Sequence, residues 1–184
     1  MGALKFRVLL DTDQEGEIFR DILIDEDANL EVFYKSIISS FGFDGGQMAS
    51  FYISNDDWDK GPEISLMDLS FEGDEALEDQ AIVMSSTLLC DNIEVHDQKL
   101  ILVHDFLRMW IFLIELIDRS DEMIMAPEVV LSMGTPPAED SKEPNLDIED
   151  GDLDFSGYED EFGGDEFEDG YDEEDFNNMG EQDY

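Results

Sequence analysis

The C-terminal part of the sequence cannot contribute to a hydrophobic core, and this limits where the chain can fold. Residues 138–184 contain 21 Asp and Glu residues and a single basic residue, Lys142. Acidic side chains at this density repel one another, and the segment has too little apolar area to offset the entropy that folding would cost. We therefore predict one folded domain over residues 1–137, which is long enough for one core, and a disordered acidic-aromatic tail over residues 138–184.

The predicted domain is strongly acidic as well, and its charge excludes two classes of partner. The chain has a formal net charge of −41, and residues 1–137 contribute about −21 of it. Phosphate backbones and anionic lipid head groups repel such a chain, so we expect no direct binding to nucleic acid or to a membrane.

A single cysteine, Cys90, allows no internal disulfide, and the N-terminal residues show no apolar signal core. We therefore expect a cytoplasmic protein.

Hydrophobic periodicity predicts several strands and one main helix. Apolar residues alternate over residues 4–10 and again over 18–24, which predicts an antiparallel hairpin. After a capping residue, Asn29, apolar residues recur at helical spacing over residues 30–41, which predicts a helix that faces the core. The other predicted elements are strands at 48–54, 99–105 and 110–118, a short helix near 86–90, and an acidic excursion over the outside of the sheet at 55–80.

The most apolar stretch, residues 100–117, includes four polar side chains. These are His104, Asp105, Arg108 and Glu115, so the stretch predicts two buried strands rather than a membrane span. The combined pattern is typical of an α+β fold, here a single domain with a mixed or antiparallel sheet and a principal helix packed on it. We expect one core that includes Phe33, Ile37, Phe41, Phe106 and Trp110.

Four short motifs follow one another along the predicted domain. They are the hairpin and helix pattern from Ile18 to Ile37, Ser40-Phe41-Gly42-Phe43, Asp105-Phe106-Leu107-Arg108-Met109-Trp110, and Pro136-Pro137-Ala138-Glu139-Asp140. In this order they resemble the motifs of the plasmid pRiA4b Orf-three-like proteins, a family of small α+β domains. The resemblance implies that residues 1–137 adopt the fold of that family.

The departures from the family pattern fall on its polar positions. Family histidines fall on Tyr34, Gln47, Ala49 and Phe112 of this chain, and a family aspartate falls on Arg108. The chain therefore lacks the imidazoles that would bind a metal or transfer a proton near neutral pH. We predict a member of the family that is not an enzyme, with no catalytic residue, no metal site and no cofactor.

A few acid, imidazole and thiol groups are of the types that serve as catalytic or metal-binding residues. Asp105 and Glu115, on adjacent predicted strands and near His104, could form a carboxylate pair, which is the basis of an alternative as an enzyme or metal protein. No nucleophile or phosphate-binding glycine loop accompanies them, so we favour structural roles. His104 and His96 are interpreted as ordinary histidines, and Cys90 as a small buried hydrophobe.

Two further segments resemble binding sites in part. Asp150 to Glu161 has the acidic spacing of a calcium loop, but Phe155 occupies the sixth position, where that loop needs glycine, so specific calcium binding is not expected. The methionine-rich segment from Met123 to Met133 could form a partner groove. We favour a final core element or a linker there.

Aromatic residues are spaced through the acidic tail, and they suggest more than solubility. A tail that only improved solubility would gain nothing from exposed rings, whereas rings among carboxylates can anchor in apolar or arginine-lined niches. We therefore expect a binding protein whose tail imitates nucleic acid on a basic surface, with RNA polymerase or the ribosome as candidate partners. The family name also suggests an accessory protein of a mobile element. The predicted partner-binding residues are Phe155, Tyr158, Phe162, Phe167, Tyr171, Phe176 and Tyr184.

Overall fold

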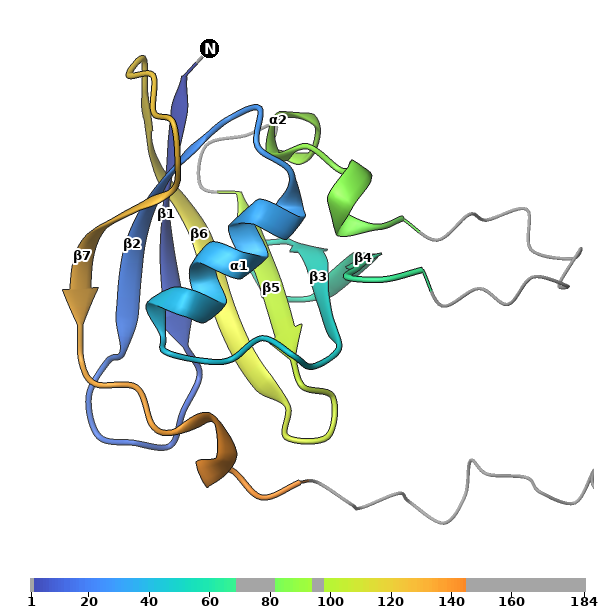
Figure 1. The fold of residues 1–184 in the computed structure, drawn as a ribbon, viewed down its shortest axis with the longest axis vertical. Helices are drawn as coiled ribbons and strands as arrows, with labels where there is room; N and C mark the ends of the chain where they lie inside the picture. Colours follow the sequence, from blue (N-terminus) through green and yellow to red (C-terminus); the bar gives the residue numbers. More distant parts are fainter. Residues whose placement is uncertain (1, 69–81, 94–97, 145–184) are drawn as a thin grey trace, which may run out of the picture. The chain divides into compact units, whose positions relative to one another are not determined.

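The computed structural model describes residues 2–68, 82–93 and 98–144, which form an α+β domain (Figure 1). Its strands form one seven-stranded sheet in the order β4-β3-β5-β6-β1-β2-β7, and all neighbouring strands are antiparallel. The strands are β1 (Ala3–Leu10), β2 (Phe19–Asp25), β3 (Ala49–Ser54), β4 (Lys60–Ser65), β5 (Lys99–His104), β6 (Trp110–Ser120) and β7 (Glu128–Met133). The helical elements are α1 (Leu30–Ser40), η1 (Met84–Ser86), α2 (Leu89–Asn92) and η2 (Glu139–Ser141).

The N-terminal hairpin forms as predicted, because the alternating apolar side chains of β1 and β2 are buried on the same face of the sheet. Leu4 pairs with Ile24, and Phe6 pairs with Ile22, and all four side chains are buried. β1 also pairs with β6, so it lies in the interior of the sheet, where both of its edges are hydrogen-bonded.

None of the described helices is long and apolar enough to cross a membrane.

The main helix, α1, also forms as predicted and lies across one face of the sheet (Figure 1). It begins where the Asn29 side chain accepts a hydrogen bond from the Val32 N–H (2.9 Å). It ends before Gly42, whose φ of +74° lies in the left-handed region that favours glycine. Phe33 points into the sheet, with its ring centroid 4.7 Å from that of Phe6 and 5.9 Å from that of Phe51. Apolar burial therefore holds the helix to the sheet.

Four of the five predicted core residues belong to one buried cluster, and one does not. Phe33, Ile37, Phe41 and Trp110 are buried together. The prediction for Phe106 is wrong: its side chain is 40% exposed, because it lies in the turn between β5 and β6 rather than on a strand.

The interpretation of Cys90 as a buried hydrophobe is also wrong. Cys90 is exposed. The helix that carries it, α2, has only four residues and buries one of them, Leu89. A helix this short turns only one side chain fully toward the core, and Cys90 follows that position.

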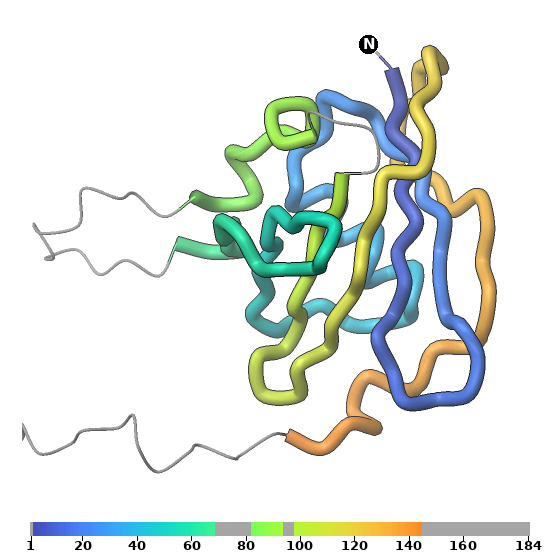
Figure 2. The backbone as a smooth tube through the Cα atoms, turned by 180° about the vertical axis from the view of Figure 1, so that it is seen from behind, coloured from blue at the N-terminus to red at the C-terminus, as the bar shows by residue number. Residues whose placement is uncertain are grey.

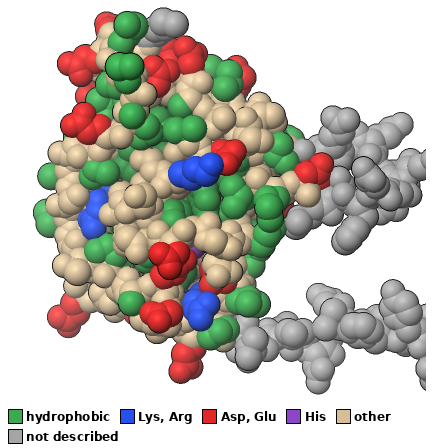
Figure 3. Space-filling model, in the orientation of Figure 1, with side chains coloured by type: hydrophobic (Ala, Val, Ile, Leu, Met, Phe, Trp, Pro, Cys, Tyr) green, Lys and Arg blue, Asp and Glu red, His purple; other side chains and the backbone are tan. Residues whose placement is uncertain are grey.

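The sequence predicted neither of the two edge strands of the sheet, β4 and β7. Residues 60–65, inside the predicted acidic excursion, form β4, which pairs with β3. The segment that was interpreted as a final core element or linker contains β7, which pairs with β2 at the opposite edge. Every residue of β7 is exposed, so it is not part of the core. Hydrophobic side chains consequently reach the surface at the left-hand edge of the domain (Figure 3).

The other face of the sheet carries no helix among the described residues (Figure 2). Its side chains include Arg7, whose guanidinium donates two hydrogen bonds to the buried Asp21 carboxylate (2.8 and 2.9 Å) and lies over the Phe19 ring. Glu115 lies on this face too, in register with Arg7 on one side and Lys99 on the other. The helix-covered face and this open face therefore differ in polarity.

Candidate functional site

Three of the sequence motifs, far apart along the chain, converge at one end of the sheet. They are the loop after α1, the turn between β5 and β6, and the segment around η2. Together they surround a hollow of about 430 Å³. The residues that line it are Gly42, Asp44, Gly46, Gln47, Asp105, Arg108, Ala138, Glu139 and Asp140. This end of the sheet is the candidate functional site.

The turn between β5 and β6 is organised by the side chain of Asp105. Asp105 has a φ of +57°, a left-handed conformation that aspartate tolerates better than most residues. Its carboxylate accepts hydrogen bonds from the N–H groups of Leu107 (3.0 Å) and Arg108 (3.2 Å) and from the Arg108 guanidinium (3.1 Å). The aspartate of the motif therefore acts here as a turn cap.

The same contacts set the charge of Asp105. Burial alone would raise the pKa of its carboxyl, but the hydrogen bonds from the Arg108 guanidinium and from the backbone of Arg108 and Leu107 outweigh it. The net effect lowers the pKa of Asp105 below its ordinary value. A general acid needs a raised pKa near neutral pH, so this carboxylate is held in its ionised, structural form.

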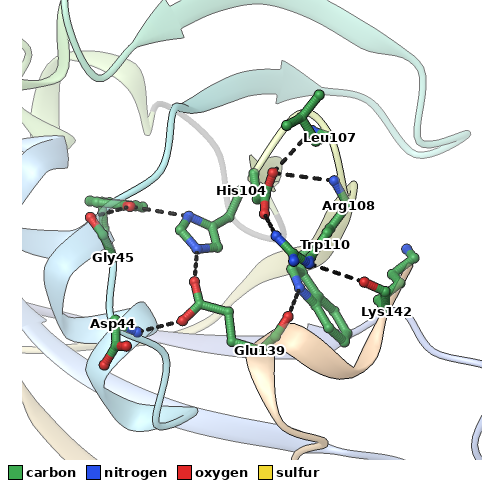
Figure 4. Close-up of polar contacts among 10 residues, drawn as sticks. Asp44, Gly45, His104, Leu107, Arg108, Trp110, Glu139 and Lys142 are labelled. Atoms are coloured by element: carbon green, nitrogen blue, oxygen red, sulfur yellow. Dashed lines mark hydrogen bonds and ion pairs between the residues drawn. The ribbon is translucent and has the colours of Figure 1, made fainter. Parts of the chain in front are cut away.

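His104, the last residue of β5, lies at the centre of the site (Figure 4). The residue is fully buried, and both ring nitrogens have partners: Nε2 lies 2.7 Å from Glu139 Oε1 and Nδ1 lies 3.1 Å from the Tyr34 hydroxyl oxygen. An ionised carboxylate only accepts hydrogen bonds, so Nε2 donates to Glu139. The ring is therefore occupied on both sides by groups of this chain.

Tyr34 connects the histidine to α1 and to the loop that follows this helix. Its hydroxyl also lies 3.4 Å from the Gly45 carbonyl oxygen. Burial, with a contribution from the nearby Glu139 charge, raises the pKa of Tyr34 to about 12. The phenol is therefore neutral at physiological pH, and its hydroxyl links His104 to the loop after α1 by hydrogen bonds.

Glu139 joins the C-terminal segment to two other parts of the domain besides His104. Its second carboxylate oxygen accepts a hydrogen bond from the Asp44 N–H (2.7 Å), and its backbone carbonyl accepts one from the Trp110 indole N–H (3.0 Å). A few residues later, the Lys142 ammonium donates to the Met109 carbonyl (2.6 Å). We call the set formed by Tyr34, His104, Arg108, Trp110, Glu139 and Lys142 the clasp.

The contacts of the clasp extend beyond residue 137, which is the end of the folded domain predicted from the sequence. Arg108 Nε donates to the Lys142 carbonyl (3.1 Å), so contacts continue past Pro137. The compact unit extends from Met1 to Leu146. Residues 138–144 carry acidic side chains but belong to the domain in space.

Comparison with known proteins places this fold in a family. The model of the family described as plasmid pRiA4b ORF-3-like protein matches residues 2–150. The chain belongs to this family. The crystal structure of a protein of unknown function from Methanosarcina mazei Go1 superposes on it with a TM-score of 0.60 at 14% sequence identity, over 78% of this chain and 76% of that one. At this identity the likeness concerns the fold alone. Among curated proteins, none matches the chain.

The positions that depart from the pRiA4b ORF-3-like pattern lie in and around the candidate site. Tyr34 and Arg108 belong to the clasp, and Gln47 lines the hollow. Ala49 pairs with His104 in register, and Phe112 packs against Phe41 with ring centroids 5.0 Å apart. Where the resemblance implies histidines, this pRiA4b ORF-3-like chain therefore has a phenol, an amide and buried apolar groups.

The structure separates the carboxylate pair that the sequence suggested. Glu115 is in register with Lys99, at the opposite end of β5 from Asp105. Six residues of strand rise separate the two positions, about 20 Å. Within the described ranges, no group of three His, Cys, Asp or Glu side chains is placed to hold a metal ion.

His96, the calcium-like segment 150–161 and the seven tail aromatics lie outside the described residues. The residue that sequence reasoning missed is Glu139, the partner of His104. The Pro136 to Asp140 motif contained it, and that motif was the available signal.

Proposed function

We propose that this pRiA4b ORF-3-like protein is a non-enzymatic, cytoplasmic binding protein whose acidic tail engages a basic, normally nucleic-acid-facing surface of a large assembly such as RNA polymerase or the ribosome. The charge distribution carries the proposal: residues 138–184 contain 21 of the 50 acidic residues, together with seven aromatic rings. A flexible polyanion is attracted to basic channels at long range, and rings provide short-range anchors.

The clasp supports this proposal because it fixes the point at which the acidic segment begins. Glu139 and Lys142 are held by His104, Trp110 and Met109. An acidic chain that starts from a firm attachment stays close to any surface on which the domain has docked. Its effective concentration at that surface is then set by the length of the tail.

The test compares three forms of the protein for binding to purified RNA polymerase and to purified ribosomes. The first ends after Leu146, which keeps the clasp and the compact unit and removes the rest of the acidic tail. The second replaces the tail phenylalanines by serine at unchanged charge, and the third replaces tail acids by amides. The phenylalanines in question are Phe155, Phe162, Phe167 and Phe176.

Loss of the tail should abolish high-affinity binding. The serine form should mainly dissociate faster, whereas the amide form should associate more slowly and lose salt dependence, since the Debye length falls from about 10 Å at 0.1 M salt to about 3 Å at 1 M. Equal affinity of the tail-free and full-length proteins for both assemblies would contradict the proposal. Metal analysis of the purified protein is a second check, because a stoichiometric bound metal would favour the alternative of a metal protein.

A further inference from the structure

The two edges of the sheet are protected to different degrees. β4 carries Pro62, which has no N–H to donate, and the exposed charges of Lys60 and Glu63. These are features by which proteins prevent other strands from adding to an edge. β7 carries one exposed charge, Glu128, but has neither proline nor a basic residue, and within the described part of the chain no strand lies beyond it.

Exposed apolar side chains are concentrated on this unprotected edge. Val129, Val130, Leu131 and Met133 are 40–51% exposed, and Met123 and Met125, which precede the strand, are more exposed still. Single exposed apolar residues are normal, but a continuous group on one strand is typical of an interaction surface. The β7 edge therefore has the composition of a docking strand.

Hydrogen bonds elsewhere in the sheet fix which backbone groups of β2 point toward β7. The Leu10 N–H donates to the Ile18 carbonyl, so the backbone of Ile18 points toward β1. Successive residues of a strand point their backbone groups to opposite edges. Phe19 and Asp21 therefore point toward β7.

The register then identifies the free backbone groups of β7. Met133 and Leu131 pair with those two residues of β2, so their own backbone groups point back toward β2. A side-chain contact is consistent with this direction: the Met133 carbonyl accepts a hydrogen bond from the guanidinium of Arg20, which is a residue of β2 (2.8 Å). Ser132, between them, directs its N–H and C=O away from the sheet. An added strand would find this pair of groups at the open edge.

Side chains on both faces of β7 could contact such a strand. Leu131 and Met133 are in register with residues of the open face. Val129 lies on the helix side, where it lines a shallow hollow of about 430 Å³ with Val32, Lys35 and Pro127. Alternate apolar side chains of an incoming strand would therefore pack on one face or the other.

Charge distinguishes the possible occupants. Residues 121–135 contain Asp121, Glu122 and Glu128 and no Lys or Arg. A second copy of this chain would bring the same acids and a further net charge of −41 to the edge. A strand with basic side chains meets attraction instead.

We propose that β7 is a docking edge for an extended segment of a partner protein in which apolar and basic side chains alternate, and that this segment adds to the sheet beside Ser132. Main-chain hydrogen bonds would provide affinity, and the alternating side chains would provide specificity. This proposal does not depend on the acidic tail, so its test is independent of the function proposed above.

The test uses the full-length protein and a displayed library of random peptides of about eight residues, the length of an ordinary strand. Ser132→Pro removes the outward N–H and none of the N–H groups of Leu131 and Met133 that face β2, while Ser132→Ala is the matched control that keeps the outward N–H. Peptides are selected on the wild type after removal of those that bind Ser132→Pro, which also removes peptides bound by charge alone.

Selected peptides should alternate apolar residues with Lys or Arg, should bind Ser132→Ala like the wild type, and should bind Ser132→Pro about tenfold or more weakly. N-methylation of alternate peptide amides should abolish binding to the wild type, which tests the edge even where Ser132→Pro lowers stability. No enrichment, or equal binding to Ser132→Pro and Ser132→Ala, would overturn the proposal. Sedimentation that showed a wild-type dimer dissociated by Ser132→Pro would assign the edge to a second copy and overturn it as well.

Discussion

The core under α1 and the clasp at the end of the sheet both join distant parts of the chain, but they do so with different interactions. Under α1, Phe33 contacts the rings of Phe6 and Phe51, and all three side chains are fully buried. In the clasp, His104 is equally buried, yet both of its ring nitrogens are hydrogen-bonded. His104 is thus as fully buried as the three rings, and the chemistry of the buried groups differs.

This difference determines how each region responds to change. Apolar packing depends on volume and is indifferent to pH, because no group in it titrates. A buried polar network depends on each partner being present, since removal of one leaves another without a hydrogen bond. Substitution and pH should therefore separate the two regions.

The largest effect is expected in the core. Phe33→Ala should lower the free energy of unfolding by about 3–5 kcal/mol at any pH where the protein is folded, because it removes a fully buried ring between the helix and the sheet. Denaturant titration measures this change. Val32→Ala is the matched control in the same helix: its side chain is 40% exposed, and a change below about 0.5 kcal/mol is expected. Similar losses for the two variants would show that α1 does not pack as described.

A smaller loss is expected in the clasp. Glu139→Ala should cost about 1–3 kcal/mol, because it leaves Nε2 of the buried His104 without its acceptor. The bond from Trp110 should persist, since it is made to the backbone carbonyl of residue 139. Glu139→Gln retains a side-chain acceptor and should recover part of the loss in the same titration. Equal stability of both variants and the wild type would mean that the clasp does not hold residues 138–144.

The sequence predicted the core far better than it predicted the clasp or the sheet edges. Strands β1 and β6 and helix α1 were predicted correctly because one face of each is buried, which imposes a period that the sequence shows. β7 has no buried face, so no alternation marks it. β4 carries a proline and lies within an acidic segment, and both features favour a loop.

The clasp depends on contacts that no local pattern encodes. His104 and Glu139 are 35 residues apart, and only the paired strands and the return of the chain after β7 bring them together. The family resemblance indicated the correct segments without saying what they do. For Asp105 and Glu115, the prediction that their strands are adjacent is correct. The register of these strands nevertheless places the two carboxylates at opposite ends of β5.

The third effect is confined to alkaline pH. The pKa of Tyr34 is raised to about 12 in the folded domain, whereas an unfolded tyrosine ionises near pH 10. Between these values the folded state binds more protons than the unfolded state, so stability should fall as pH rises from about 10 to about 12 and should be unaffected below that window. Melting curves of the wild type and Tyr34→Phe across this range isolate the contribution. Identical slopes for the two proteins would show that this phenol is not buried in the clasp.

The smallest effect is expected at Phe106, which lies in the same motif as the buried Trp110. Phe106 and Trp110 belong to the same turn segment, but Phe106 is 40% exposed while Trp110 is 3% exposed and donates to Glu139. Phe106→Ser should therefore change the free energy of unfolding by less than about 0.5 kcal/mol, whereas Trp110→Ala should cost about 3–5 kcal/mol, because it removes both a core ring and a bond of the clasp. Both values come from the same denaturant titration. A large cost for Phe106→Ser would mean that the turn packs against the domain, and the boundary between core and surface would then have to include residue 106.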